Sequence, residues 1–186
     1  MSTPVFLSIA GSDCSAGAGA QADLKTGFAL GCYPLTALTC VVSEVPGCVR
    51  GIQPMSADFV RDQIELCLKT YPVRAVKCGM LYSPAIVRAV ACALADFEGA
   101  LVIDPVMIAT AGEALMQQEA VRVYEEELFP RAGVLTPNCD ELAALLSCPA
   151  PTTAAELEDA ARALVARYGC AVLAKGGHLG GDTCTD

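Results

Sequence analysis

Short apolar runs alternate with helix-like segments along this chain, and this alternation constrains the fold more than any other feature. Strand-like runs are expected at residues 5–10, 35–42, 75–80, 101–103, 133–136 and 170–174. Helices are expected at residues 20–30, 57–70, 85–97, 113–128, 138–146 and 154–168, with Ser56 as the N-cap of the second. Because the strand runs are apolar on both faces, they predict a mainly parallel sheet covered by helices on each side. The pattern predicts an α/β fold in which residues 1–186 form a single domain.

The composition argues against two classes of partner. The 186 residues carry a formal net charge of −9, whereas nonspecific binding to nucleic acid needs a cationic face. Hydrophobic residues make up 54% of the chain, yet no apolar stretch reaches membrane-spanning length without Gly, Pro or a charged residue. We therefore expect a buried sheet, with neither nucleic acid nor a membrane as partner.

The cysteines indicate a reducing compartment. All eleven lie in or near apolar runs, without a C-x-x-C pair or a Cys/His cluster of zinc-binding spacing. The N-terminus lacks the basic and long apolar regions of a signal peptide. We expect a cytoplasmic protein whose cysteines are small core residues.

A candidate phosphate site follows the last strand-like run, where the chain reads Lys175-Gly176-Gly177-His178. Glycines let backbone N–H groups approach an anion, and the lysine supplies a positive charge. His178 is the only histidine, and a lone histidine in a loop is more often structural than catalytic.

Polar or glycine-containing segments also follow other expected strands. In a parallel α/β sheet, ligands bind at the carboxyl ends of the strands. The segments at these ends are residues 11–13, 77–80, 104–107, 136–141 and 175–178. We expect the functional residues to converge on this one edge of the sheet.

The glycine-rich loop at residues 11–19 does not match a nucleotide-binding motif. It contains no G-x-x-x-x-G-K-[ST] sequence, and the G-x-G-x-x-G spacing that starts at Gly17 fails because Ala22 replaces the third glycine. Glu44 lies in roughly the region of a ribose-binding acid, but no clear acid ends the second strand. A nicotinamide dinucleotide site is therefore disfavoured.

Two acidic positions have both a structural and a functional interpretation. Asp104, which precedes Pro105, is either a turn cap or a carboxylate that organises a metal-nucleotide complex. Asn138 and Glu141 begin a helix that Pro137 favours, and they form either a capping box or a pair that reaches Mg²⁺ through water. The residues alone leave both pairs of alternatives open.

Five ordered segments carry a resemblance to a known family. They are residues 10–26, 77–81, 104–107, 135–138 with Glu141, and 175–179. In order and spacing, over nearly all of the chain, they resemble the hydroxymethylpyrimidine and phosphomethylpyrimidine kinases of thiamine biosynthesis. That family belongs to the ribokinase-like superfamily, which also includes the pyridoxal kinases.

The resemblance implies a three-layer α/β/α sandwich of the ribokinase-like type and a kinase that uses ATP and Mg²⁺. Its implied substrate is a small aminopyrimidine alcohol, which is phosphorylated once and then again as the monophosphate. The implied substrate-binding residues are Gly11, Asp13, Ala18, Val41, Met80 and Val106. The implied nucleotide-binding residues are Lys175, Asn138 and Glu141, and the implied metal ligands are Asp104 and Glu141. Relatives often pair, so a homodimer is compatible with the resemblance.

One departure from the family concerns the substrate. Val41 stands where the family usually has a glutamine that bonds the aminopyrimidine, and an apparent two-residue insertion precedes Gly47. Since Val41 cannot hydrogen-bond a ring, the polar contact is expected from Ser43 or Glu44, or the substrate differs. A kinase for pyridoxal or pyridoxine is therefore an alternative.

The second departure concerns the C-terminal part. The family continues past Lys-Gly-Gly-His to a Gly-Thr-Gly-Cys segment whose backbone amides form an anion hole, and this chain has no such segment. We expect a C-terminally incomplete domain that by itself lacks the catalytic cysteine and anion hole. A naturally short, catalytically inactive pyrimidine-binding module is a further alternative.

Overall fold

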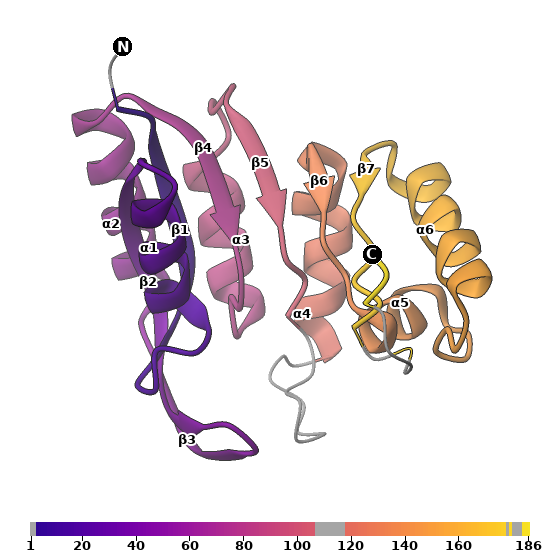
Figure 1. Ribbon diagram of the computed structural model, residues 1–186. Coiled ribbons are helices and arrows are strands. Elements are labelled where there is room, and N and C mark those ends of the chain that lie inside the picture. The colour runs from indigo at the N-terminus through magenta and orange to yellow at the C-terminus, as the bar shows by residue number, and fades with distance from the viewer. Residues whose placement is uncertain (1–2, 107–117, 178, 180–183) are drawn as a thin grey trace.

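The computed structural model describes residues 3–106, 118–177, 179 and 184–186, and within them a seven-stranded sheet forms the centre of the molecule (Figure 1). The strand order is β3-β2-β1-β4-β5-β6-β7. The strands are β1 (Val5–Asp13), β2 (Tyr33–Val45), β3 (Cys48–Pro54), β4 (Val73–Cys78), β5 (Ala100–Ile103), β6 (Val134–Leu135) and β7 (Ala171–Val172). Every neighbouring pair is parallel except β2 and β3. The expected α/β fold with a mainly parallel sheet is confirmed.

Helices cover both faces of this sheet. They are α1 (Gly19–Ala29), α2 (Ala57–Thr70), α3 (Pro84–Ala93), α4 (Gln118–Val123), α5 (Cys139–Leu146) and α6 (Ala154–Tyr168). In Figure 1, α1 lies in front of the sheet, whereas α2 and α3 lie behind it. The Ser56 side chain accepts a hydrogen bond from the Phe59 N–H, so the expected N-cap of α2 is confirmed.

The main core lies between the sheet and its helices. The strands contribute fully buried side chains, among them Leu7, Ile9, Val76, Ile103 and Leu135. The helices contribute others, among them Ile64, Val87, Leu142 and Leu164. Because the central strands are buried on both faces, their continuous apolar runs are explained. Among the residues that the structure describes, no helix is both long and apolar enough to cross a membrane.

Two regions differ from the expectation drawn from the sequence. Strand β3 was not expected, and it forms an antiparallel hairpin with β2 through a turn in which Gly47 has a φ of +79°. The helix expected at residues 113–128 lies partly outside the described residues. Its described part is α4 followed by a π-helical turn, Tyr124–Leu128. The hairpin matters for function, because it extends beyond the carboxyl edge of the sheet (Figure 1).

Candidate active site

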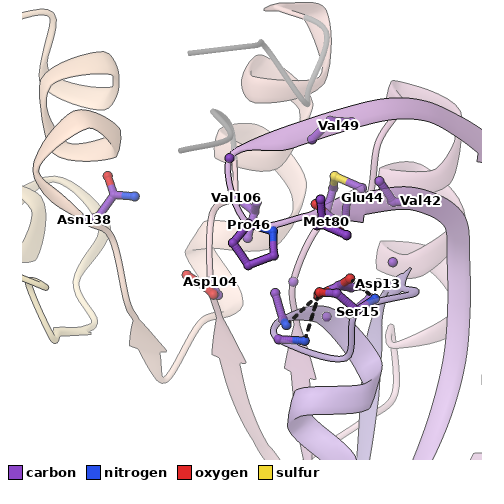
Figure 2. A pocket seen from close by; sticks show the side chains of 18 of the residues that line it. Asp13, Ser15, Val42, Glu44, Pro46, Val49, Met80, Asp104, Val106 and Asn138 are labelled. Atoms are coloured by element: carbon purple, nitrogen blue, oxygen red, sulfur yellow. Dashed lines mark hydrogen bonds between the residues drawn. The ribbon is translucent and has the colours of Figure 1, made fainter. Parts of the chain in front are cut away.

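A pocket with a volume of about 460 Å³ lies at the carboxyl edge of the sheet (Figure 2). Three kinds of segment line it: the end of β1 with the β1–α1 loop, the β2–β3 hairpin, and the residues at or after the ends of β4, β5, β6 and β7. Parallel strands bring their carboxyl ends to one edge, so segments far apart in the sequence meet here.

Most of the residues singled out in the sequence line this one pocket. They are Gly11, Asp13, Ala18, Met80, Asp104, Val106, Asn138, Glu141 and Lys175. Met107 and His178, which belonged to two of the expected edge segments, lie outside the described residues. The expected convergence on one sheet edge is therefore found for the described members of the set.

Val41 is the exception, because it is not among the residues that line the pocket. Its side chain is 41% exposed, whereas that of its neighbour Val42 is 3% exposed and lines the pocket. Side chains alternate between the two faces along a strand, so Ser43 is also exposed and does not line the pocket, whereas Glu44 does. Of the two polar candidates near Val41, only Glu44 reaches the pocket.

The end of the pocket nearest β2 and β4 is apolar. Cys40, Val42 and Met80 form a small buried cluster, against which Val106 packs. A Cβ atom on Gly11 would stand 2.9 Å from the Cys40 Sγ and 3.1 Å from the Met80 Cε, so a larger residue there would displace the pocket wall. This end can accept a flat ring through contact with aliphatic and sulfur atoms.

Two buried hydroxyl groups hold the segment that carries Met80 from behind. The Thr39 hydroxyl donates a hydrogen bond of 2.7 Å to the Met80 carbonyl. The Tyr124 hydroxyl donates a hydrogen bond, also of 2.7 Å, to the Gly79 carbonyl. The polar groups of this wall are thus satisfied within the protein.

Asp13 organises the glycine-rich loop. Its carboxylate accepts hydrogen bonds from the backbone N–H groups of Ser15, Gly17 and Ala18, at 2.7, 2.9 and 2.8 Å, and from the Ser15 hydroxyl at 3.0 Å. Burial pushes the pKa of the Asp13 carboxyl upward, but these hydrogen bonds outweigh burial and lower the pKa below its ordinary value. Because these backbone N–H groups donate to Asp13, the loop shapes the pocket and does not resemble a phosphate loop.

Lys77 adds a positive charge to the pocket wall. Its ammonium group lies 3.0 Å from the Asp23 carboxylate, which also accepts a hydrogen bond of 2.5 Å from the Ser8 hydroxyl. Ser8 is fully buried. Lys77 was considered only as part of a strand-end segment, because nothing in the sequence shows that Asp23 of the following helix reaches it.

Lys175 and Asp104 meet at the other end of the pocket. The Lys175 ammonium lies 2.7 Å from the Asp104 carboxylate, which also accepts a hydrogen bond of 3.2 Å from the Thr136 hydroxyl. The Lys175 N–H donates to the Pro137 carbonyl, and a β-bridge joins Lys175 to Asn138. The chain after β7 therefore continues beside the chain after β6, which places the cation beside the carboxylate.

Asn138 and Glu141 form the capping box of α5. The Asn138 Oδ1 accepts a hydrogen bond of 2.9 Å from the Glu141 N–H, and the Glu141 carboxylate accepts one of 2.8 Å from the Asn138 N–H. The structural alternative for this pair is therefore realised. Among the described residues, no group of three or more His, Cys, Asp and Glu side chains could hold a metal ion by itself.

Beyond Ser43 and Glu44, the sequence did not identify the residues of the hairpin as part of the site. Val45, Pro46, Cys48 and Val49 all line the pocket. The signal that could have found them is Pro46-Gly47 between two β-branched runs, which is typical of a turn between strands.

Comparisons with known proteins agree on one family. The family model described as phosphomethylpyrimidine kinase matches residues 13–186. A Rhizobium meliloti hydroxymethylpyrimidine/phosphomethylpyrimidine kinase is 41% identical over 184 residues, which are 99% of this chain and 69% of the relative. The chain spans only 33% of a longer Schizosaccharomyces pombe relative that is 45% identical over 183 residues.

Solved structures of vitamin kinases share the fold. The crystal structure of phosphomethylpyrimidine kinase from Clostridium difficile 630 is 34% identical with a TM-score of 0.85, and the match covers 98% of this chain and 78% of that one. Pyridoxal kinase from Staphylococcus aureus, in complex with AMP-PCP and pyridoxal, is 31% identical with a TM-score of 0.84. That match covers 99% of this chain and 66% of the other.

Proposed function

Because this chain belongs to the phosphomethylpyrimidine kinase family, we propose that the protein containing it phosphorylates an aminopyrimidine alcohol with ATP. The proposed substrate is 4-amino-5-hydroxymethyl-2-methylpyrimidine, and its monophosphate accepts a second phosphoryl group in thiamine biosynthesis. One observation carries the proposal: a single pocket has an apolar end formed by Val42, Met80 and Val106 and a charged end with Lys175 and Asp104.

The apolar end supports the placement of the ring. Met80, Val42 and Val106 offer aliphatic and sulfur contacts for a flat heterocycle. In the proposed orientation the hydroxymethyl group points toward Asp104, where the phosphoryl group arrives. Phosphoryl transfer depends mainly on positioning and charge neutralisation, which this arrangement supplies.

Lys175 is the proposed contact for the nucleotide phosphates. Its ammonium group is partly exposed and is paired with Asp104, so an incoming phosphate competes with that carboxylate for the same cation. Asn138 and Glu141 are proposed to lie on the nucleotide side of the pocket. The partly exposed Lys175–Asp104 ion pair contributes only about 0 to 1 kcal/mol to stability. We therefore assign this pair a role in binding.

Magnesium fits the donor set of this end of the pocket. In proteins Mg²⁺ keeps several waters and binds one or two carboxylates together with substrate phosphates, so it needs no closed cage of side chains. Asp104 and Glu141 would supply those carboxylates. When bound, the ion neutralises charge on the phosphoryl oxygens.

The proposal is tested by measuring ADP release from Mg-ATP in the presence of the alcohol, using the whole protein that contains residues 1–186. The wild-type protein should release ADP only when the alcohol is present. An Asp104→Asn variant should lower the rate about a hundredfold or more, because the charge that positions the metal and Lys175 is removed. Its affinity for the alcohol alone should be unchanged, and equal rates in both proteins would contradict the assigned role of Asp104.

A pyridoxal-type alcohol is a second candidate substrate. It is favoured by the similarity to the Staphylococcus aureus pyridoxal kinase and by the exposed Val41 at a position where a ring-binding glutamine was expected. The ratio of kcat/KM for the two alcohols decides between them. If kcat/KM is higher for the pyridoxal-type alcohol than for the aminopyrimidine, the pyridoxal-type alcohol is the preferred substrate.

We further propose that residues 1–186 form one ribokinase-like domain of a cytoplasmic protein. All eleven cysteines are free thiols, which is compatible with a reducing compartment. A homodimer stays a prediction, and sedimentation of the purified protein tests it.

A further inference from the structure

Glu44 differs from the other charged side chains of the pocket. Asp13, Lys77, Asp104 and Lys175 all have hydrogen-bond or ion-pair partners within the protein. The Glu44 carboxyl group lines the same pocket and makes no hydrogen bond or ion pair with any residue that the structure describes. Glu44 therefore places a carboxyl group with no partner among the described residues at the apolar end of the pocket.

The backbone of Glu44 is nevertheless fixed. The Glu44 carbonyl accepts a hydrogen bond of 3.1 Å from the Cys14 thiol, and the Glu44 N–H donates one of 3.4 Å to the same sulfur. The β2–β3 ladder shifts register at this point, because Ser43 pairs with Gly51 and Glu44 with Val49. Such a bulge re-aims a side chain beside a site, and in Figure 2 Glu44 lies next to Val42 and Met80.

The surroundings of Glu44 favour its neutral form. Burial raises the pKa of the Glu44 carboxyl, and the negative charge of Asp13 raises it further. The other titratable or charged groups around it include Cys14 after β1, Cys40 on β2, Lys77 on β4, and Cys48 and Arg50 on β3. Lys77 is already paired with Asp23, so none of these groups neutralises Glu44 by an ion pair.

We propose that the Glu44 carboxyl group recognises the ring edge on which an exocyclic amino group stands beside a ring nitrogen. One carboxyl oxygen accepts a hydrogen bond from the amino group, and the other oxygen shares a proton with the ring nitrogen. This inference rests on the proposed function and names the part of the substrate that Glu44 binds. A pyridoxal-type ring has no such edge, so Glu44 favours the aminopyrimidine.

The pairing requires one proton between the two partners. Either a protonated carboxyl meets a neutral ring, or a carboxylate meets a protonated ring. A carboxamide forms the same two hydrogen bonds with a neutral ring and needs no added proton. When the pH is above the pKa values of both the Glu44 carboxyl group and the ring nitrogen, binding by Glu44 therefore takes up one proton. Binding by a glutamine takes up none.

Calorimetric titration of the whole protein with 4-amino-5-hydroxymethyl-2-methylpyrimidine tests the proposal between about pH 6 and pH 9. The wild-type Kd should rise about tenfold per pH unit at the alkaline end. A Glu44→Gln variant should bind with a Kd that does not change over that alkaline range. Ser43→Ala is the matched control, because Ser43 is exposed outside the pocket, and it should behave like the wild type.

A second titration uses the analogue without the amino group. The wild type should bind it at least about tenfold more weakly than the aminopyrimidine at pH 6, whereas a Glu44→Ala variant should bind both about equally. Thermal unfolding checks that both Glu44 variants are folded. If the wild type binds the aminopyrimidine but Glu44→Gln keeps its pH dependence, or Glu44→Ala still discriminates, the inference is overturned. If the folded wild type binds no aminopyrimidine at all, the proposed function itself fails.

Discussion

The starts of α5 and α6 carry the same motif in two different settings. Asn138 and Glu141 form a capping box at α5, and Thr153 and Glu156 form one at α6, with the same reciprocal hydrogen bonds. Glu141 is 2% exposed and lines the pocket, whereas Glu156 is exposed on the surface. A capping box by itself therefore identifies a helix start and says nothing about a ligand.

The position of each helix in the sheet explains the difference. Helix α5 directly follows β6, so its N-terminus lies at the carboxyl edge, where the β-bridge holds Asn138 beside Lys175. Helix α6 follows another helix, and none of its residues lines the pocket. A helix N-terminus attracts anions, and of these two only that of α5 lies beside the pocket.

The largest expected difference between the two boxes is in stability. Glu141→Ala leaves the partly buried Asn138 N–H without its acceptor and should lower the free energy of unfolding by about 1–3 kcal/mol. Glu156→Ala should cause a smaller loss, because water can replace the exposed carboxylate. Urea unfolding measures both variants, and equal losses would show that burial does not distinguish the two boxes.

A smaller but more specific difference is expected in nucleotide binding. Asn138→Ala and Thr153→Ala should each lower stability by about 1 kcal/mol, since each removes an N-cap side chain. Only Asn138→Ala should also weaken ADP binding, by about three- to tenfold, if the α5 N-terminus faces the nucleotide. Calorimetric titration with ADP compares the pair. If Thr153→Ala also weakened ADP binding, the two capping boxes would not differ in their effect on the nucleotide.

The smallest expected effect is a pH dependence at α6. Hydrogen bonds from the Thr152 N–H and hydroxyl and from the Thr153 N–H lower the pKa of the Glu156 carboxyl below its ordinary value of 4.5. A carboxyl with a lowered folded-state pKa contributes stability above pH 4.5, and this contribution disappears as the pH falls through the folded-state value. Glu156→Gln should therefore show a flatter loss of stability between neutral pH and acid. Urea unfolding at several pH values measures this loss. If the free energy of unfolding falls equally with pH in the wild type and the variant, the Glu156 carboxylate does not contribute to the pH dependence.

The fold could be predicted from the sequence because local and global signals agree. The runs around Leu7, Val76 and Ile103 are continuous and apolar, as a strand buried on both faces requires. Glycine and acidic residues at the ends of those strands then indicated which edge carries the site. Both signals depend on residues that are close together in the chain, so they can be recognised from the sequence alone.

What could not be predicted depends on register and on distant partners. Val41 and Val42 are chemically identical, and only the pairing of β2 decides which one faces the pocket. The β3 run is short and interrupted by Arg50 and Gly51, so its strand pattern is weak. The family resemblance implied Asp13 as a substrate contact, and only the loop geometry reveals that backbone N–H groups donate to its carboxylate.

Thr39 and Tyr124, whose hydroxyl groups hold the Met80 and Gly79 carbonyls, are not among the residues that line the pocket. Under the proposed function, a genetic screen for loss of vitamin synthesis should nonetheless return substitutions at both positions. Such alleles would look unrelated on the linear map, since the two residues are 85 positions apart, yet they would damage the same pair of peptide groups. Removing either hydroxyl leaves a buried carbonyl without its donor, and the displaced peptide then alters the shape that the ring meets.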